Sequence, residues 1–415
     1  MLLLTVSGCG NRVSFRDYVD RSGTHTTKNP TSAQSIEMAR NLYEAVWRNV
    51  YLDYVDSGFN GQDWGRWRHH YDGELKDLDD AQVAISSMLA SLGDEYTRYL
   101  PPRDMKEQTL KIDSHLFGVG IQIAKKDGKI VVVAPMPDTP AAKAGVRSKD
   151  EIVTIDKTST AGMSLEDAAD HIRGEQGTTV SLTLKRGHEL VTLSMQRAEI
   201  KIQSVFTRDF HHPNVGYIRL NSFIGETVPQ EMLQAFEKFQ DKPGLILDLR
   251  GNYGGLLDNA VEISEMLMEK GDIVSMSGRS QLATRNYKAN GKPVFTKELV
   301  LLIDGGSASA SEILSGALKD NHRAVLIGTK TFGKGLVQKI VPLDEGAGLN
   351  ITISKYYTPK GTDINKKGIE PDVHVTFTPQ SIKKNHDLQL QAALGILARR
   401  LGETKPVETA TLLPD

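Results

Sequence analysis

The stretch of sequence that decides the fold runs from Leu299 to Asp320 and reads LVLLIDGGSASASEILSGALKD. It begins with an apolar run, which is typical of a short strand buried on both faces. Its last residues place apolar side chains at three- and four-residue steps, which is typical of a helix. Two glycines and three alternating serines join the two halves. The stretch therefore predicts a strand that turns sharply into a helix.

The same alternation of strand and helix patterns extends over residues 199–378. Strand patterns occur in NVGYIRL, GLILDLR, LVLLID and AVLIG, and helical patterns lie near 228–240, 256–270 and 310–320. Alternation of this kind predicts an α/β core with parallel strands. Strand patterns return after Lys334 in GLVQKIVPL and GLNITISKYYT. Residues 379–415 are predicted to form a last helix and a disordered polar tail.

A helical region precedes the core, at residues 33–110. Apolar side chains recur at helical spacing in SIEMARNLYEAVWRNVYLDYV and again in DDAQVAISSMLASLGDEYTRYL. We expect this arm to serve packing or dimerisation. Together with the region that follows it, the pattern predicts an α/β multidomain protein.

Residues 111–198 are β-rich, with five short strand patterns and two helical pieces. Their order resembles a PDZ domain, and DTPAAKAGVRSKDEIVTIDK resembles the most recognisable segment of that family. PDZ domains bind the C-terminus of a peptide as an added strand. The turn formed by Phe117, Gly118, Val119 and Gly120 lies where the family has its carboxylate-binding loop. Glycines expose backbone N–H groups that can hold a carboxylate, and an ordinary hairpin turn is the alternative.

Charge and cysteine content exclude several classes of function. The 415 residues carry 50 basic and 52 acidic side chains and a net charge of −2, so no overall field attracts nucleic acid. The single cysteine, Cys9, excludes an intrachain disulfide, and the histidine spacing predicts no metal site. We expect no cofactor.

The first residues bear on location. The apolar start ends in Val6-Ser7-Gly8-Cys9, which resembles the lipobox of bacterial lipoproteins, although a basic region before it is missing. We therefore expect export to the periplasm or cell envelope, with lipidation of Cys9 and a flexible linker over the rest of 1–32.

The three serines of the central turn have two interpretations. Ser309 and Glu312 form the S-x-x-E pattern of a capping box, which explains the turn without any chemistry. A serine between a strand end and a helix N-terminus, however, projects outward beside unpaired N–H groups that suit a developing oxyanion. Ser311 lies on another side of the helix, so geometry leaves Ser307 or Ser309 as the candidate nucleophile.

Lys334 is the candidate base for that hydroxyl. A lysine accepts a proton only when it is neutral, and burial lowers its pKa toward that condition. Lys334 follows the strand AVLIG and lies between Gly333 and Gly335. The same segment begins like a phosphate-binding P-loop from Gly328, but Gly335 replaces the required Ser or Thr, and a strand pattern follows in place of a helix.

These motifs together resemble the C-terminal processing peptidases, which are serine proteases of the tail-specific family. GSASASEILSGALKD and TFGKGLVQ resemble the paired signatures of the family. LILDLRGNYGGLL resembles its glycine loop, with Tyr253 where proline is usual, and KYYTPKGTDINKKGIEPDVHV and LGDEYTRYL resemble two further family segments. The resemblance covers roughly residues 35–380.

The resemblance implies a role for each matching residue. It implies that Ser309 is the nucleophile, Lys334 the general base and Gln338 the amide that orients the lysine. It implies oxyanion donors at Ala310 and at the Gly254–Gly255 loop. A glutamine suits its task because, unlike a carboxylate, it does not favour the ammonium form of the lysine.

The expected function is a serine endopeptidase that cleaves proteins near unstructured C-terminal tails recognised by its PDZ domain. The family implies a dimer and leaves room for an adaptor protein. The rival interpretation is a non-catalytic PDZ scaffold that retains the α/β layer for assembly.

Overall fold

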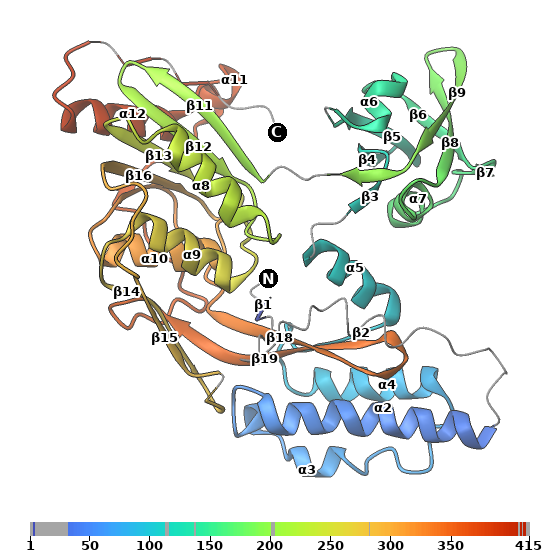
Figure 1. Cartoon of the computed structure of the whole chain (residues 1–415). Coiled ribbons are helices and arrows are strands. Elements are labelled where there is room, and N and C mark those ends of the chain that lie inside the picture. Colours follow the sequence, from blue (N-terminus) through green and yellow to red (C-terminus); the bar gives the residue numbers. More distant parts are fainter. Residues whose placement is uncertain are drawn as a thin grey trace. The chain divides into compact units, whose positions relative to one another are not determined.

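The computed structural model of the chain describes residues 3–4, 32–112, 116–136, 138–200, 204–281, 283–405, 407–408 and 410–411. It divides into two compact units, which Figure 1 colours along the sequence. The first unit contains the chain up to Thr109 and again from Ser204 onward, and the second contains Leu110–Gln203. Each unit has its own buried core.

A six-stranded sheet with the order β11-β12-β13-β16-β17-β20 forms the centre of the first unit. Its antiparallel edge is β11 (Val205–His211), and its parallel strands are β12 (Asn214–Leu220), β13 (Gly244–Asp248), β16 (Glu298–Ile303), β17 (Val325–Gly328) and β20 (Val373–His374). The four strands predicted from the alternation are β12, β13, β16 and β17, so the α/β core is confirmed. Because neighbouring parallel strands end at the same edge, the turns after β13, β16 and β17 lie together.

Helices cover both faces of this sheet. Successive strand residues point to opposite faces, so Leu245 and Leu301 share a core with one set of helices, while Ile246 and Val300 share a core with another. The first set is α8 (Val228–Lys238), α9 (Leu257–Leu267) and α10 (Ala310–Asp320), and the other face is covered by α12 (Leu388–Arg400). The sheet is therefore buried, which explains its continuous apolar strands.

A second sheet of the first unit has the order β1-β18-β19-β14-β15, with β2 paired to β19. Its strands are β1 (Leu3–Leu4), β2 (Arg98–Leu100), β14 (Asp272–Gly278), β15 (Arg285–Lys288), β18 (Leu336–Pro342) and β19 (Gly348–Tyr357), and the short helix η3 (Asp344–Gly346) joins β18 to β19. The strand patterns expected after Lys334 are β18 and β19.

The N-terminal arm packs within the first unit. Its helices are α2 (Ser32–Asp53), η2 (Phe59–Gly61), α3 (Trp64–Trp67) and α4 (Leu78–Ala90), and α5 (Pro102–Ile112) follows β2. The Val55 N–H donates to the Thr352 carbonyl at 2.8 Å, and Lys339 pairs with Asp53 at 2.9 Å. The apolar face of the arm therefore belongs to the core of its own unit, and dimerisation stays a prediction.

The second unit is a sheet with the order β4-β5-β6-β8-β9, with β7 paired to β6. The strands are β4 (Ile121–Lys126), β5 (Lys129–Pro135), β6 (Glu151–Ile155), β7 (Thr158–Ser159), β8 (Thr179–Arg186) and β9 (Glu189–Gln196); β3 (Leu116–Gly118) pairs separately with β10 (Ala198–Ile200). Its two helices are α6 (Pro140–Ala144) and α7 (Leu165–Ile172). The predicted β-rich domain with two helices is confirmed, which completes the predicted fold class.

The C-terminal region differs from its prediction. The expected helix is divided into α11 (Pro379–Lys383) and α12, because Asp387 caps α12 by accepting the Leu390 N–H at 2.9 Å. The sequence predicts a disordered tail, but two of its described residues make defined contacts. Ala410 is buried, and the Glu408 carboxylate accepts the N–H groups of His211 and His212 at 2.6 and 3.0 Å.

The described residues contain neither a helix suited to cross a membrane nor a cluster of side chains suited to bind a metal ion. No helix in that part of the chain has both the length and the apolar character that a membrane crossing requires. The same residues contain no group of three or more His, Cys, Asp or Glu side chains placed to hold a metal ion. Cys9 and the linker predicted around it lie outside the described ranges.

Candidate active site

The three serines of the turn between β16 and α10 are distinguished by their hydrogen bonds. All three are fully buried. Ser307 Oγ donates to the Leu249 carbonyl at 2.8 Å, and Ser311 Oγ donates to the Asn252 carbonyl at 2.8 Å. Ser309 Oγ has no hydrogen-bond partner among the described residues. Of the three hydroxyls, that of Ser309 alone is unpartnered in the described part of the chain.

The backbone of Ser309 is strained. Its φ of +59° and ψ of −113° lie in a region that residues with a side chain rarely adopt. Strain of this kind is typical of a serine held on a sharp strand-to-helix turn. The Ala308 N–H donates to the Asn252 carbonyl at 3.0 Å, so the loop after β13 supports the turn. The Ala310 N–H, at the start of α10, meets no acceptor in the described part of the chain.

Gly254 brings the loop after β13 against Ser309. A Cβ on Gly254 would lie 2.9 Å from both the Ala310 nitrogen and Ser309 Cβ, so only glycine permits this approach. Its N–H donates to Asn252 Oδ1 at 2.9 Å. Gly255 lies against the backbone of Phe223 and Ile224. Of the three predicted oxyanion residues, Ala310 and Gly254 therefore meet beside Ser309, and the Gly254 N–H already has an acceptor.

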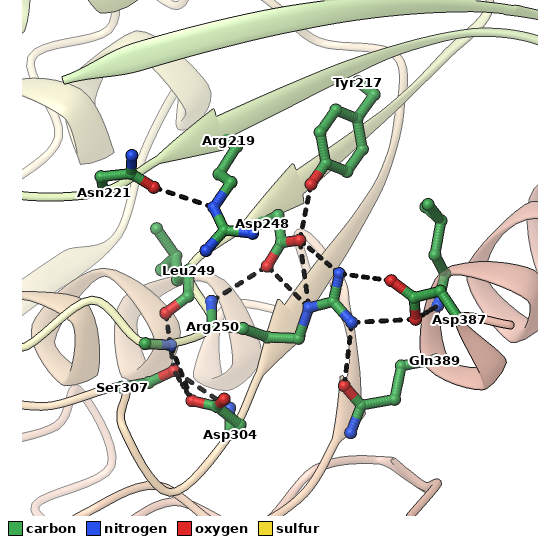
Figure 2. Close-up of polar contacts among 12 residues, drawn as sticks. Tyr217, Arg219, Asn221, Asp248, Leu249, Arg250, Asp304, Ser307, Asp387 and Gln389 are labelled. Atoms are coloured by element: carbon green, nitrogen blue, oxygen red, sulfur yellow. Dashed lines mark hydrogen bonds and ion pairs between the residues drawn. The ribbon is translucent and has the colours of Figure 1, made fainter. Parts of the chain in front are cut away.

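A buried ionic network anchors this loop (Figure 2). Arg250 binds Asp248 through two nitrogens, at 2.6 to 3.0 Å, and binds both carboxylate oxygens of Asp387 at 2.9 Å. The Tyr217 hydroxyl donates to Asp248 at 2.7 Å, and Gln389 Oε1 accepts from Arg250 at 3.1 Å. Burial disfavours the charged forms of both Asp248 and Arg250. The attraction between them is stronger, so Arg250 holds the pKa of Asp248 below its usual value, and the carboxylates of Asp248 and Asp387 raise the pKa of Arg250. The network fixes the start of the loop on the cap of α12.

Lys334 lies in the loop after β17 with only 9% of its surface exposed. Burial lowers its pKa to about 8, and Arg98 acts in the same direction, whereas Asp94, Glu95 and Glu312 act to raise it. Its Nζ lies 4.4 Å from the centre of the Tyr96 ring, which is a cation–π distance. The Phe332 N–H donates to the Ser307 carbonyl at 3.1 Å, so the lysine loop is bonded to the serine turn.

Gln338 is 1% exposed, and both atoms of its amide lack a partner among the described residues. Thr352 lies opposite it on β19, and its buried hydroxyl is also unpartnered. Unbonded buried polar atoms are rare and require an explanation. Ser309, Lys334 and Gln338 are thus buried together in one unit, and neither Ser309 Oγ nor the Gln338 amide makes a hydrogen bond here.

The predicted carboxylate loop lies in the second unit. Val119 is fully buried, and its carbonyl accepts the Ala141 N–H at 2.9 Å. Gly120 has a φ of +74°, and its carbonyl accepts the Met136 N–H at 2.9 Å. The N–H groups of Val119 and Gly120 have no acceptor in the described residues, and β4, which follows them, is an edge strand. Phe117 and Gly118 belong to β3.

Sequence reasoning missed several residues that contact the site. Tyr96 lies in the quoted segment LGDEYTRYL, and Tyr356 lies in KYYTPKGTD, where its hydroxyl bonds to the carbonyls of Ser309 and Lys334. Glu312 accepts the Ser309 N–H, as the capping-box pattern predicts, but its bonds to Thr331, Gly333 and Lys334 were not expected. The family segments contained these residues but gave no signal for their contacts.

Comparison with known proteins gives two family matches. Residues 214–375 match Peptidase family S41, and residues 118–196 match the PDZ domain. The Carboxyl-terminal-processing protease of Picosynechococcus sp. is 39% identical over 372 residues, which is 87% of this chain and 89% of the relative. The Carboxy-terminal-processing protease of Bartonella bacilliformis is 37% identical and covers 86% of this chain and 83% of its own.

A solved structure supports the same relationship. The photosystem II D1 C-terminal processing protease is 34% identical to this chain with a TM-score of 0.57. The match covers 86% of this chain and 97% of the solved one. The likeness therefore extends over most of the chain.

Proposed function

The chain belongs to the carboxyl-terminal-processing proteases of peptidase family S41, and we propose that it is a serine endopeptidase in which Ser309 is the nucleophile and Lys334 the general base. The observation that carries this proposal is the free hydroxyl of Ser309. Its neighbours Ser307 and Ser311 use theirs to hold the loop after β13. Gln338 orients the lysine.

The chemistry proceeds by acyl transfer. Neutral Lys334 takes the proton from Ser309 Oγ while that oxygen forms a bond to the scissile carbonyl carbon. The resulting ammonium then gives its proton to the amide nitrogen as the C–N bond breaks, which leaves an acyl-enzyme. Water, deprotonated by the same amine, attacks the ester, and its cleavage returns the proton to Ser309. Because Ser309 Oγ has no partner among the described residues, Lys334 must move toward it for this step, and the unpartnered Gln338 amide can accept a hydrogen bond from the amine.

The oxyanion is stabilised by N–H groups beside Ser309. The unbonded Ala310 N–H lies at the N-terminus of α10, where the helix dipole favours negative charge. The second donor comes from the loop of Gly254 and Gly255. Since the Gly254 N–H donates to Asn252 here, the loop must rotate before this group can serve.

Labelling with a fluorophosphonate, a reagent for activated serines, tests this proposal. We expect covalent modification at Ser309 at a rate that increases with pH through about 8, the pKa of Lys334. The neutral amine is the active form, and it makes up about a tenth of the population at pH 7 and falls about tenfold per pH unit below that. The rate is measured between pH 6 and 9, and peptide mass spectrometry identifies the site.

The Ser309→Ala variant is the control and should not be labelled. A non-catalytic scaffold would not react with the fluorophosphonate at any pH. Labelling of wild type at a rate that does not change between pH 6 and 9 would contradict Lys334 as the base.

We also propose that the PDZ domain selects substrates by an unstructured C-terminal tail. The free N–H groups of Val119 and Gly120 support this, because backbone donors of this kind can hold a terminal carboxylate. The tail would pair with β4, which follows these residues and lies at the edge of the sheet. Phe117 and Gly118, which the sequence assigned to this turn, lie in β3 just before it.

Blocking the tail carboxylate should weaken binding. A peptide substrate with a C-terminal amide should have a KM at least about tenfold higher than its free acid, because charge-assisted hydrogen bonds contribute about 1.5–3 kcal/mol. Gly120→Val should abolish this preference, since a Cβ there would lie 2.4 Å from Thr139. Gly128→Ala is the matched control, with a φ of +76° but open space around it. Equal KM values for acid and amide in wild type would contradict the proposal.

Location and assembly follow from the sequence. We propose an exported protein of the periplasm or cell envelope, anchored by a lipid on Cys9, and mass spectrometry of the mature N-terminus would identify that modification. The proposed homodimer is measured by light scattering. An adaptor protein stays an expectation.

A further inference from the structure

The proposed mechanism leaves one buried carboxylate unused, that of Glu312 in the first turn of α10. Its side chain is fully buried and accepts four hydrogen bonds. Oε2 accepts the Ser309 N–H at 2.8 Å and the Lys334 N–H at 2.9 Å. Oε1 accepts the Thr331 hydroxyl at 2.6 Å and the Gly333 N–H at 2.7 Å.

Three of these four donors are backbone N–H groups, so the arrangement suits an ionised carboxylate. Two oxygens offer about four lone-pair positions, and the four donors fill them. The Thr331 hydroxyl accepts the Ile369 N–H at 2.7 Å, which leaves its own proton to donate to Glu312. Burial is the largest influence and raises the pKa of Glu312 above its usual value, although each of the four hydrogen bonds acts to lower it. The carboxylate is also placed at the N-terminus of α10, where the helix dipole favours a negative charge.

The donors come from two separate parts of the chain. Ser309 precedes α10, whereas Thr331, Gly333 and Lys334 belong to the loop after β17. The N–H groups of the proposed nucleophile and base therefore meet on a single oxygen atom. The Tyr356 hydroxyl also bridges these two residues, because it forms hydrogen bonds to the carbonyl oxygens of Ser309 and Lys334. Ser309 and Lys334 are thus bridged twice, once through their N–H groups and once through their carbonyls.

We propose that Glu312 is a positioning residue that, together with Tyr356, sets the separation of the serine and lysine backbones from which proton transfer takes place. This proposal rests on Ser309 and Lys334 being the catalytic pair. Glu312 touches neither the substrate nor a reacting atom. It acts because misplacing a reacting group by about 1 Å can cost about a hundredfold in rate.

Glu312 has a second effect that a purely structural residue lacks. Its negative charge raises the pKa of Lys334, as do those of Asp94 and Glu95, while burial and Arg98 lower it. Removing the charge at Glu312 therefore lowers the lysine pKa. The alkaline rise of kcat/KM then moves to lower pH, even as the maximal rate falls.

The test is steady-state cleavage of a tail peptide by full-length Glu312→Gln and Tyr356→Phe between pH 6 and 9. For Glu312→Gln we expect kcat to fall roughly tenfold to a hundredfold with little change in KM, because the amide can accept only about half of the bonds. Its pH profile should shift to lower pH. Tyr356→Phe should reduce kcat without moving the profile, since it removes a bridge but no charge.

Ser315→Ala is the matched control. Its hydroxyl is buried in the same helix and donates to the Ser311 carbonyl at 2.6 Å, with no bond to the lysine loop. It should retain wild-type kcat and pH profile. Thr331→Ser and Thr331→Val supply a second series if Glu312→Gln fails to fold: serine keeps the donor to Glu312 and the activity, whereas valine loses both.

The outcomes separate this inference from the proposed function. If Ser309→Ala or Lys334→Ala stays active, the catalytic pair itself is wrong. If those variants are inactive but Glu312→Gln keeps the wild-type kcat and pH profile, the positioning role alone is overturned. A loss of kcat in Glu312→Gln that comes with an unmoved profile and an equal loss in Ser315→Ala would also overturn it.

Discussion

Ser309→Ala and Lys334→Ala each lower the turnover of a tail peptide by at least about a thousandfold, since nucleophile and base act as a unit and losing either removes the same covalent pathway. Ser309 supplies a hydroxyl that no other described residue engages, and Lys334 supplies an amine whose pKa burial lowers to about 8. Turnover is measured by mass spectrometry of the cleaved peptide at pH 8. The double variant should be no slower than the slower single variant.

The neighbouring serines provide the controls for this prediction. Ser307→Ala and Ser311→Ala each remove one buried hydrogen bond to the loop after β13. We expect each to cost about 1 kcal/mol of stability and to retain measurable turnover. If Ser307→Ala were inactive while Ser309→Ala cleaved normally, the nucleophile would be Ser307, the alternative that the sequence pattern leaves open.

Arg250→Met lowers the free energy of unfolding by about 3–5 kcal/mol, because it leaves buried carboxylates without their cation. Asp248 is fully buried and Asp387 is 1% exposed, so neither is compensated by water. Both pair with Arg250 through bonds of 2.6 to 3.0 Å. The change is measured by urea denaturation of the purified protein at pH 7.

Arg400→Met is the matched control. Arg400 pairs with Glu298 at 2.8 Å, but both side chains are more than 40% exposed. A surface pair of this kind contributes about 0–1 kcal/mol, so its loss should be small. Equal destabilisation by the two variants would show that the buried network does not hold the loop after β13.

Much of the fold was predictable because local signals decide it. The strand LVLLID and the helix that follows it lie where the sequence places them, as β16 and α10. The apolar face of α2 is visible in the spacing of its residues, but the sequence does not indicate what the helix packs against. Only the structure shows that Val55, just after α2, donates its N–H to the Thr352 carbonyl of β19. The tail beyond Arg400 resembles a disordered segment in composition, yet Glu408 binds two backbone N–H groups that lie almost two hundred positions away.

The candidate site was predictable only through motifs. The pattern S-A-S-A-S offers three similar hydroxyls, and spacing alone could not choose between Ser307 and Ser309. The choice depends on the carbonyls of Leu249 and Asn252, which occupy the flanking hydroxyls and belong to a loop more than fifty residues earlier. In the same way, nothing near Lys334 in the sequence indicates that Tyr96 lies against its amine.

The sequence by itself determined which segments become strands and helices, where the sharp turn falls, and which residue types could do chemistry there. Only the tertiary structure decided which hydroxyl lacks a hydrogen-bond partner, how far the lysine amine is buried from solvent, and that Glu312 bonds to both loops. The physical reason is range: backbone preferences and apolar spacing act between near neighbours in the chain. Hydrogen-bond partners and desolvation instead depend on groups that only folding brings together.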